Sequence, residues 1–563
     1  MNVTGKDIVP DTGSVSSEPF NQSPEFHGFN AYECDPALVR LSEHLPHNVI
    51  SSFNHLGQWI GSPEANELAR LANTEPPKLK THDAKGNRLD QVEFHPAWHA
   101  LMRRSVSNGL HCSIWDDNEE EKGERNFIRS IRYILSAESE CGHLCPVTMT
   151  NASVAALMAK PEVLNQWLPQ IKSRQYDSSH RAPHLKSGVT IGMGMTEKQG
   201  GTDVRANITT AHDAGAGLWR INGHKWFMSA PMCDAFVVLA QASHENTMPG
   251  QPSCFLIPRI LPDGTPNAME FQRLKDKLGN RSNASSEVEF NNSFGYLIGD
   301  LDNGLRVILE MVTLTRLDCA TSSVGLMRAA LSEAVHHCRN RQVFGKHLID
   351  QPIMTRVLAD MALDVIAATA LTLRLAQAFD RASSDKSEAA YARLMTPIVK
   401  YWVCKTASPL IGEAMECLGG NGYVEEGNLA RFYRESPVNA IWEGSGNVMC
   451  LDVLRVMKRG PKLLDAVLEG FEKDMNGDTR GTLNVLRAAA KVAMDDEGSA
   501  RLFTEQMALS AASAELTKSF GGELADAFSE SRLGGAWRAT YGMLNGRYNA
   551  KGILDYAFPE IRA

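Results

Sequence analysis

The segment IGMGMTEKQGGTDV, residues 191–204, lies where the hydrophobic pattern of the chain changes, and it contains four glycines. Glycine-dense segments often bind phosphate, but a Walker loop requires a lysine where Gly201 stands. The dinucleotide pattern GxGxxG also fails, because Glu197 occupies its third glycine position. The local residues therefore predict a glycine-rich β-turn.

The chain before this segment has a mainly helical pattern. Apolar residues recur at three- and four-residue spacing in ALVRLSEHL (37–45) and FIRSIRYILSAESE (127–140). The stretch NTEPPKLKTHDAKGNRLDQ (73–91) is rich in proline, glycine and charge, and it predicts a long loop. We expect an N-terminal helical domain over residues 36–187, preceded by a flexible arm over residues 1–35.

The chain after this segment first changes to short β-rich stretches. LWRINGHKWFMSA, AFVVLAQAS and SCFLIPRI are separated by turn residues, with no helical pattern between them. They predict a small, mostly antiparallel β-domain over residues 188–295, and the missing strand–helix alternation argues against a Rossmann unit. The helical period returns at Gly304 and predicts a bundle of long helices over residues 296–457. Residues 458–563 predict an extra helical domain, so the fold class is α+β.

The composition limits the class of protein. A chain of 563 residues is too long for a single core and predicts several domains. Its formal net charge of −9 lacks the global basic character of nucleic-acid binders. Eleven cysteines without a CxxC pair predict a reducing compartment and no metal site. The polar N-terminus and the absence of an 18-residue apolar run predict a cytoplasmic protein that does not span a membrane.

Three further motifs could carry chemistry, and each also has a purely structural interpretation. RNRQVFGK (339–346) is a basic segment with an aromatic residue, or simply a solvated helix end. ECLGGNGY (416–423) permits close backbone approach to a ligand, or only ends a helix. NAIWEGSGNVMCLD (439–452) presents the carboxylate of Glu443 at the start of a helix. Alternatively, that carboxylate is a surface charge and Ser445 a helix cap.

The order of these motifs along the chain is more specific than any one of them. The chain resembles the acyl-CoA dehydrogenase flavoprotein family over residues 36–457. In both, the motifs follow one another in the order MTExxGGTD, KWFMS, a β-domain, RxxFGK, LGGNGY and WEGS. The chain resembles most closely in sequence the AidB-like (adaptive alkylation response) branch of this family. The resemblance lies in the segments GMGMTEKQGG, GHKWF, KDKLGNRSNAS, WEGSGN and MCLDVLRV and in the extra C-terminal domain.

The resemblance implies FAD as cofactor and assigns residues to it. Two segments of the β-domain would cover the flavin ring: Met193, Gly194, Met195, Thr196, Gly201 and Thr202, then Phe227, Met228 and Ser229. Across a subunit contact, the FAD diphosphate and adenine would meet Arg341, Phe344, Gly419 and Gly420. The other end of the cofactor would meet Ile441, Trp442, Gly444, Ser445, Gly446 and Asn447. An arginine suits the diphosphate because its planar fork binds two oxygens.

The resemblance also implies the reaction. Glu443 matches the base that removes the α-proton of an acyl thioester while a β-hydride passes to the flavin. Some relatives carry this base on the long helix, where this chain has Thr315, and Arg316 next to it is a candidate substrate contact. The family's usual Pro-x-Ala-Gly-Ser is replaced by residues 198–202, which makes efficient use of ordinary fatty acyl-CoA less expected.

The resemblance finally implies partners. An acyl-CoA-like small molecule is the expected ligand, and a homo-oligomer, a tetramer in most of the family, is the expected assembly. The AidB-like branch is associated with binding of double-stranded DNA, for which the candidate residues are Arg455, Lys458, Arg459 and Arg532. The alternative is an ordinary metabolic acyl-CoA dehydrogenase whose C-terminal domain serves only oligomerisation, since residues 457–563 hold 14 basic and 15 acidic residues.

Overall fold

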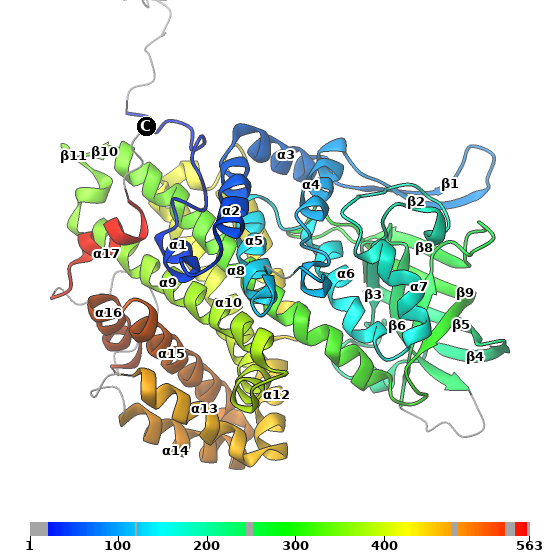
Figure 1. Ribbon diagram of the computed structural model, residues 1–563. Coiled ribbons are helices and arrows are strands. Elements are labelled where there is room, and N and C mark those ends of the chain that lie inside the picture. Colours follow the sequence, from blue (N-terminus) through cyan, green and yellow to red (C-terminus); the bar gives the residue numbers. More distant parts are fainter. Residues whose placement is uncertain (1–20, 119–120, 244–250, 476–480, 535–546, 560–563) are drawn as a thin grey trace, which may run out of the picture.

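The computed structural model describes residues 21–118, 121–243, 251–475, 481–534 and 547–559. A β-domain forms one end of the molecule and helices form the rest, with the C-terminal helices packed beside the long bundle helices (Figure 1). Buried apolar residues fall into two clusters. One is shared by the N-terminal helices, the bundle and the C-terminal helices, and the other fills the β-domain and the helices that cover it.

The N-terminal helices begin at clear sequence signals. Asp35 accepts hydrogen bonds from the Ala37 and Leu38 amides, and Ser62 accepts one from Ala65. The helices are α1 (Pro36–Ser42), α2 (His47–Ile60), α3 (Pro63–Thr74), α4 (Pro96–Ser107), α5 (Arg125–Ser139), α6 (Leu144–Leu157) and α7 (Pro161–Ile171). In the described part of the arm, residues 21–35, Ser23 Oγ lies 2.9 Å from His337 Nδ1 near the end of α8 (Gly304–Asn340).

The stretch expected to be a long loop contains a hairpin. β1 (Lys78–His82) pairs antiparallel with β2 (Arg88–Glu93), and Asp83 closes the turn by accepting from the Lys85 and Asn87 amides at 2.8 Å. The loop prediction was wrong here, because the hairpin is stabilised by tertiary contact. Asp90 accepts a hydrogen bond from the Phe271 amide of β8 (Met269–Leu274) at 3.1 Å.

The β-domain is a seven-stranded sheet that closes on itself. The order β3-β6-β4-β5-β9-β7 is completed by pairing of β6 with β7, and β8 pairs with β9. Most pairs are antiparallel, as expected, but β6 runs parallel to both β3 and β4. The strands are β3 (Ile191–Gly194), β4 (Thr210–Gly215), β5 (Leu218–Ser229), β6 (Ala235–Ser243), β7 (Ser253–Pro258), β8 (Met269–Leu274) and β9 (Ser285–Ile298).

The bundle is built on α8 (Gly304–Asn340), α9 (Pro352–Arg381) and α10 (Lys386–Cys417), followed by α11 (Leu429–Ile441) and α12 (Gly446–Arg459). A small hairpin, β10 (Gln342–Val343) with β11 (Lys346–His347), links α8 to α9. A buried ion pair fixes the bundle to the N-terminal helices, because Arg129 Nη1 lies 2.7 Å from Asp318 Oδ1 and both side chains are almost fully buried.

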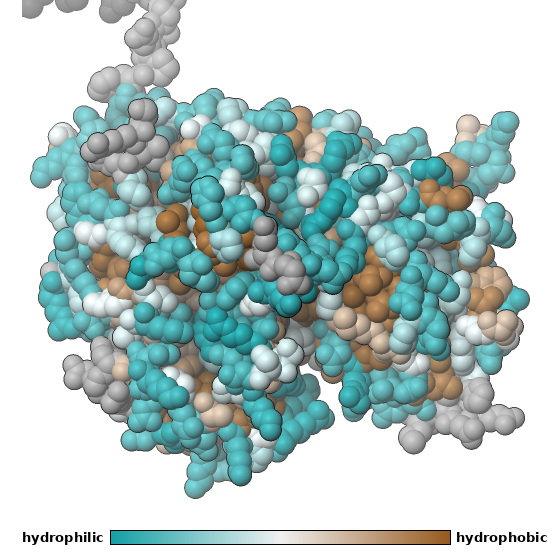
Figure 2. Space-filling view, in the orientation of Figure 1, coloured by the Kyte–Doolittle hydropathy of each residue, from teal (hydrophilic) through white to brown (hydrophobic). Residues whose placement is uncertain are grey.

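The C-terminal helices are α13 (Pro461–Asp474), α14 (Gly481–Asp495), α15 (Ala500–Ser519), α16 (Gly522–Leu533) and α17 (Ala550–Ala557). They add to the bundle core rather than form a separate one. Among the described helices, none is long and apolar enough to cross a membrane. On the face in Figure 2, hydrophobic residues appear in small groups among hydrophilic ones.

Candidate functional site

A buried ion pair fixes the turn that follows β3 to the strand β5. Lys225 Nζ of β5 lies 2.6 Å from Glu197 Oε1, and neither side chain is exposed. The same ammonium donates to the Leu239 carbonyl at 2.8 Å. The Trp226 amide donates to the Thr196 carbonyl at 2.8 Å. The MTE and GHKWF motifs, about thirty residues apart in sequence, therefore form one rigid unit.

The alternation of strand residues decides which of the predicted flavin residues can meet a ligand. Met193, Met195, Phe227 and Ser229 are partly or fully exposed. Between them, Met228 is fully buried and Gly194 is buried. Thr196, Gly201 and Thr202 lie on the accessible side of the turn. The side chain of Met228 points into the core of the β-domain, so only its backbone is placed to meet a cofactor.

Gly201 is required by a close approach within this turn. A Cβ on Gly201 would lie 2.3 Å from Thr196 Oγ1. A side chain there would displace the threonine hydroxyl, which is one of the donors predicted to face the flavin. Gly201 therefore allows the chain to fold back upon Thr196.

The WEGSG loop connects α11 to α12 and has a left-handed backbone. Glu443 has a φ of +58° and Gly444 a φ of +103°. A glutamate in this region is uncommon and requires external support. Arg316 Nε donates to the Glu443 carbonyl at 3.1 Å, and Lys400 Nζ donates to the Gly444 carbonyl at 2.6 Å. Arg316 is itself fixed by Asp452, whose Oδ2 lies 2.7 Å from Nη1.

The carboxylate of Glu443 is buried and only partly hydrogen-bonded. Its Oε2 is buried and has no hydrogen-bond partner among the described residues. Burial raises the pKa of Glu443 above its usual range, and contact with Thr315, Arg316 and Lys400 offsets this only in part. A carboxylate that is poorly solvated and has one free oxygen is a stronger base than an exposed one.

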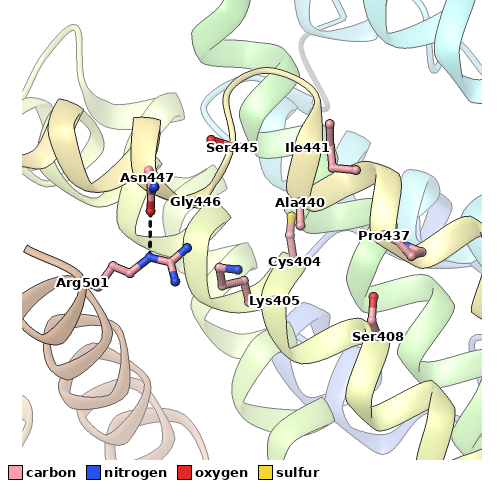
Figure 3. Close-up of a pocket in the computed structure, with 10 residues that line it drawn as sticks. All are labelled: Cys404, Lys405, Ser408, Pro437, Ala440, Ile441, Ser445, Gly446, Asn447 and Arg501. Atoms are coloured by element: carbon pink, nitrogen blue, oxygen red, sulfur yellow. Dashed lines mark hydrogen bonds between the residues drawn. The ribbon is translucent and has the colours of Figure 1, made fainter. Parts of the chain in front are cut away.

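Next to this loop is a cavity of about 480 Å³. Its lining includes four of the predicted cofactor residues, namely Ile441, Ser445, Gly446 and Asn447, together with Lys405 and Arg501 (Figure 3). Trp442 turns instead toward the β-domain, where it packs against the same cluster as Met193 and Met195. The loop thus meets the β-domain on one side and this cavity on the other.

The remaining predicted FAD residues do not join this group within one chain. Arg341 and Phe344 lie at the β10–β11 hairpin, at the end of the molecule away from β3 and β5 (Figure 1). Phe344 is 95% exposed, and Arg341 Nη1 donates to the Asn21 carbonyl at 2.5 Å. Gly419 and Gly420 are exposed, and a Cβ on either would meet nothing within 4 Å.

The four predicted DNA residues also separate. Arg455, Lys458 and Arg459 are exposed on α12. The prediction for Arg532 is contradicted, because its side chain is only 1% exposed and is paired with Asp360 and Asp364 of α9. Its role in this structure is to bind α16 to the bundle. Among the described residues, no group of three His, Cys, Asp or Glu side chains is arranged to hold a metal.

Three models of known families match the chain. They are the adaptive response protein AidB N-terminal domain over residues 21–178, the acyl-CoA dehydrogenase middle domain over 192–293 and the acyl-CoA dehydrogenase C-terminal domain over 302–458. AidB of Escherichia coli (strain K12) is 44% identical over 516 residues, which cover 91% of this chain and 94% of that protein. The chain belongs to the acyl-CoA dehydrogenase family, in its AidB-like branch. The expected family and fold are confirmed.

Other relatives support the same family assignment. Acyl-CoA dehydrogenase family member 11 of Caenorhabditis elegans is 32% identical over 484 residues, which cover 82% of this chain and 76% of that protein. The structure of C. elegans ACDH-11 in complex with C11-CoA matches with a TM-score of 0.83 at 27% identity, over 97% of this chain and 94% of that one. An acyl-CoA dehydrogenase of Bacillus anthracis complexed with FAD shares the fold, with a TM-score of 0.62 at 17% identity over 77% and 78% of the two chains. Members of this family bind FAD, so the predicted cofactor is confirmed.

Sequence reasoning missed three residues that shape the site. Lys225 and Lys400 are buried lysines, and each occurs in an otherwise apolar or aromatic stretch, GHKWF and PIVKYWV, which is the available signal. Arg501 carried no such signal. It lies in an ordinary polar helix start, and only the packing of α15 brings it to the WEGSG loop.

Proposed function

We propose that this chain is an FAD-dependent oxidoreductase of the acyl-CoA dehydrogenase type, with Glu443 as its base. Glu443 takes the α-proton of an acyl thioester and becomes a neutral carboxylic acid. The electron pair of that C–H bond forms the new α,β double bond, and the β-hydrogen leaves as hydride. Bound FAD supplies the acceptor for this hydride. The observation that carries the proposal is the buried Oε2 of Glu443, for which no described residue is a hydrogen-bond partner.

The residues around the site fit a bound flavin and an acyl chain. Met193, Met195 and Phe227 offer accessible apolar surface, and the Thr196 and Ser229 hydroxyls offer hydrogen-bond donors beside it. The unpartnered oxygen of Glu443 is available to a group that enters from outside the described structure. The relative whose structure contains C11-CoA supports an acyl-CoA ligand.

The surrounding residues have separate roles in this proposal. Arg316 binds the loop through the Glu443 carbonyl and is fully engaged with Asp452. We therefore assign Arg316 to positioning of the base rather than to direct contact with substrate. Thr315, which hydrogen-bonds the carboxylate, helps to orient it.

An anaerobic titration of the purified flavoprotein with a panel of acyl-CoA esters tests the proposal. The expected result is loss of the oxidised flavin absorbance with at least one ester. Glu443→Gln should slow this reduction by about 10²- to 10⁴-fold, the usual contribution of a general base. FAD binding should be unchanged, because Glu443 is not proposed to hold the cofactor. Glu426→Gln, at an exposed glutamate, is the matched control, and an unchanged rate in Glu443→Gln would refute the role.

We further propose that Arg341, Phe344, Gly419 and Gly420 complete the FAD site of a second copy of the chain. The exposure of Phe344 and of the two glycines favours a surface that is covered in an oligomer, a tetramer by the resemblance. Light scattering measures the assembly. Arg341→Ala should lower FAD retention without changing the unfolding of the monomer, and equal retention would contradict a shared site.

A second candidate function is DNA binding through α12. Arg455, Lys458 and Arg459 are exposed within two helical turns and have no ion-pair partner among the described residues. Replacing all three by glutamine should lower the slope of log affinity against log salt by about 2.7, since each phosphate contact contributes about 0.9. An unchanged slope would favour the alternative, an ordinary metabolic enzyme whose C-terminal domain serves oligomerisation.

A further inference from the structure

The described part of the N-terminal arm binds the hairpin β10–β11, at the end of the molecule away from the β-domain (Figure 1). The Asn21 side chain pairs with both backbone groups of Gln342. Its Nδ2 donates to the Gln342 carbonyl at 2.8 Å, and its Oδ1 accepts from the Gln342 amide at 2.7 Å. Asn21 has a φ of +59°, a left-handed conformation that asparagine adopts more readily than most residues. The two bonds therefore fix the backbone of Asn21 against β10.

The backbone of Asn21 in turn fixes Arg341, the residue before Gln342. Arg341 Nη1 donates to the Asn21 carbonyl at 2.5 Å. Within the described ranges, this carbonyl is the only hydrogen-bond acceptor of the guanidinium, and no carboxylate pairs with it. A carbonyl orients an arginine without neutralising its charge. The other N–H groups of Arg341 are therefore held in a defined place and keep a full positive charge for an anion.

Further contacts anchor the arm to the last turns of α8. The Pro24 carbonyl accepts from His336 Nε2 at 2.8 Å, and Ser23 Oγ also lies close to His337 Nδ1. The Phe26 ring packs on the His336 ring with the two centroids 4.7 Å apart. Arg341 follows directly on α8, so the arm and the helix together determine where this side chain begins and where it points.

We propose that Asn21 of the N-terminal arm is a positioning residue for Arg341, so that the arm supports the cofactor site of a second copy of the chain. The inference rests on the proposed function, in which Arg341 meets FAD across a subunit contact. An unrestrained arginine side chain loses rotamer entropy when a ligand immobilises it. The Asn21 carbonyl restrains Arg341 before the ligand arrives, so this loss on binding is smaller and the affinity is higher.

The test measures cofactor affinity rather than turnover. Apoprotein of the full chain is titrated with FAD, followed by flavin fluorescence, for wild type, Asn21→Gly, Arg341→Ala and the double variant. Glycine accepts the left-handed backbone and keeps the carbonyl, so Asn21→Gly removes only the pairing with Gln342. Gln22→Gly, at the exposed neighbour, is the matched control for the added backbone freedom. FAD binding should weaken about 3- to 10-fold in Asn21→Gly, about 10- to 100-fold in Arg341→Ala, and not at all in Gln22→Gly.

The double variant separates positioning from a merely structural role of the arm. If Asn21 acts through Arg341, Asn21→Gly should have no further effect on FAD affinity once Arg341 is alanine. Additive effects in the double variant would overturn the inference, as would dissociation of the Asn21→Gly assembly in light scattering.

The single variants distinguish failure of this inference from failure of the proposed function. Weakened FAD binding in Arg341→Ala together with wild-type affinity in Asn21→Gly would overturn the inference alone. Wild-type affinity in Arg341→Ala would refute the shared cofactor site itself, and the role of Asn21 with it.

Discussion

The buried pair of Glu197 and Lys225 should be the main support of the turn that covers the flavin. Removing one partner of a buried ion pair typically costs about 3–5 kcal/mol, because the other charge is left uncompensated. The carboxylate has other donors, since Glu197 Oε2 accepts from the Ile208 amide and from Gln199 Nε2, both at 2.7 Å. The ammonium has only one other partner among the described residues, the Leu239 carbonyl at 2.8 Å.

This asymmetry sets the expected magnitudes. Lys225→Met should lower the free energy of unfolding by about 3 kcal/mol, near the lower end of that range, and Glu197→Gln should lower it by closer to about 5 kcal/mol. The double variant should cost less than the sum of the two, because neither charge then remains buried alone. Both single variants should also retain FAD poorly, since Lys225 fixes the strand whose Trp226 amide binds the Thr196 carbonyl.

Chemical denaturation followed by tryptophan fluorescence gives the unfolding free energies, and gel filtration of the holoprotein gives the retained FAD. Lys198→Met is the matched control, since Lys198 is exposed and its Nζ lies 5.9 Å from the centre of the Trp226 ring. The reasoning would be refuted if Lys225→Met cost under about 1 kcal/mol, or if the double variant showed strict additivity.

Three other outcomes follow from the structure. Burial alone would raise the pKa of Glu140, but hydrogen bonds and charge from His143 hold it at about 2. The stability that this depressed pKa contributes is present above about pH 4.5 and should be lost as the pH falls toward 2. In an acid-unfolding curve, Glu140→Gln should therefore show a smaller loss of stability over this pH range than the wild type. Arg532→Met should cost about 3–5 kcal/mol and speed proteolysis of the C-terminal helices, because it leaves Asp360 and Asp364 buried without their partner; an unchanged digestion pattern would contradict this. The pKa of Glu443 is raised and the base acts in its ionised form, so the rate of flavin reduction should rise with pH through that pKa. A flat pH profile of this rate would rule out Glu443 as the base.

Much of the fold was predictable because its signals are local. The change from helical to strand period near residue 188, and its return near Gly304, located the β-domain, since amphipathic periods reflect which side chains face a core. The hairpin at residues 78–93 was mistaken for a loop, because its exposed strands carry little apolar signal and are stabilised by contact with β8. Sheet closure and the parallel pairings of β6 depend on long-range contacts that no local pattern contains.

The sequence by itself determined the family, the cofactor and the identity of the motif residues, because the order of several short motifs is specific even where each one is weak. Tertiary structure alone decided how those motifs work. It buried Lys225 beneath Glu197, left one oxygen of Glu443 without a partner among the described residues and turned the side chains of Met228 and Arg532 inward, away from the ligands expected for them. It also brought Arg501 to the cofactor side of the WEGSG loop. The physical reason is that burial and charge pairing are properties of packing between distant segments.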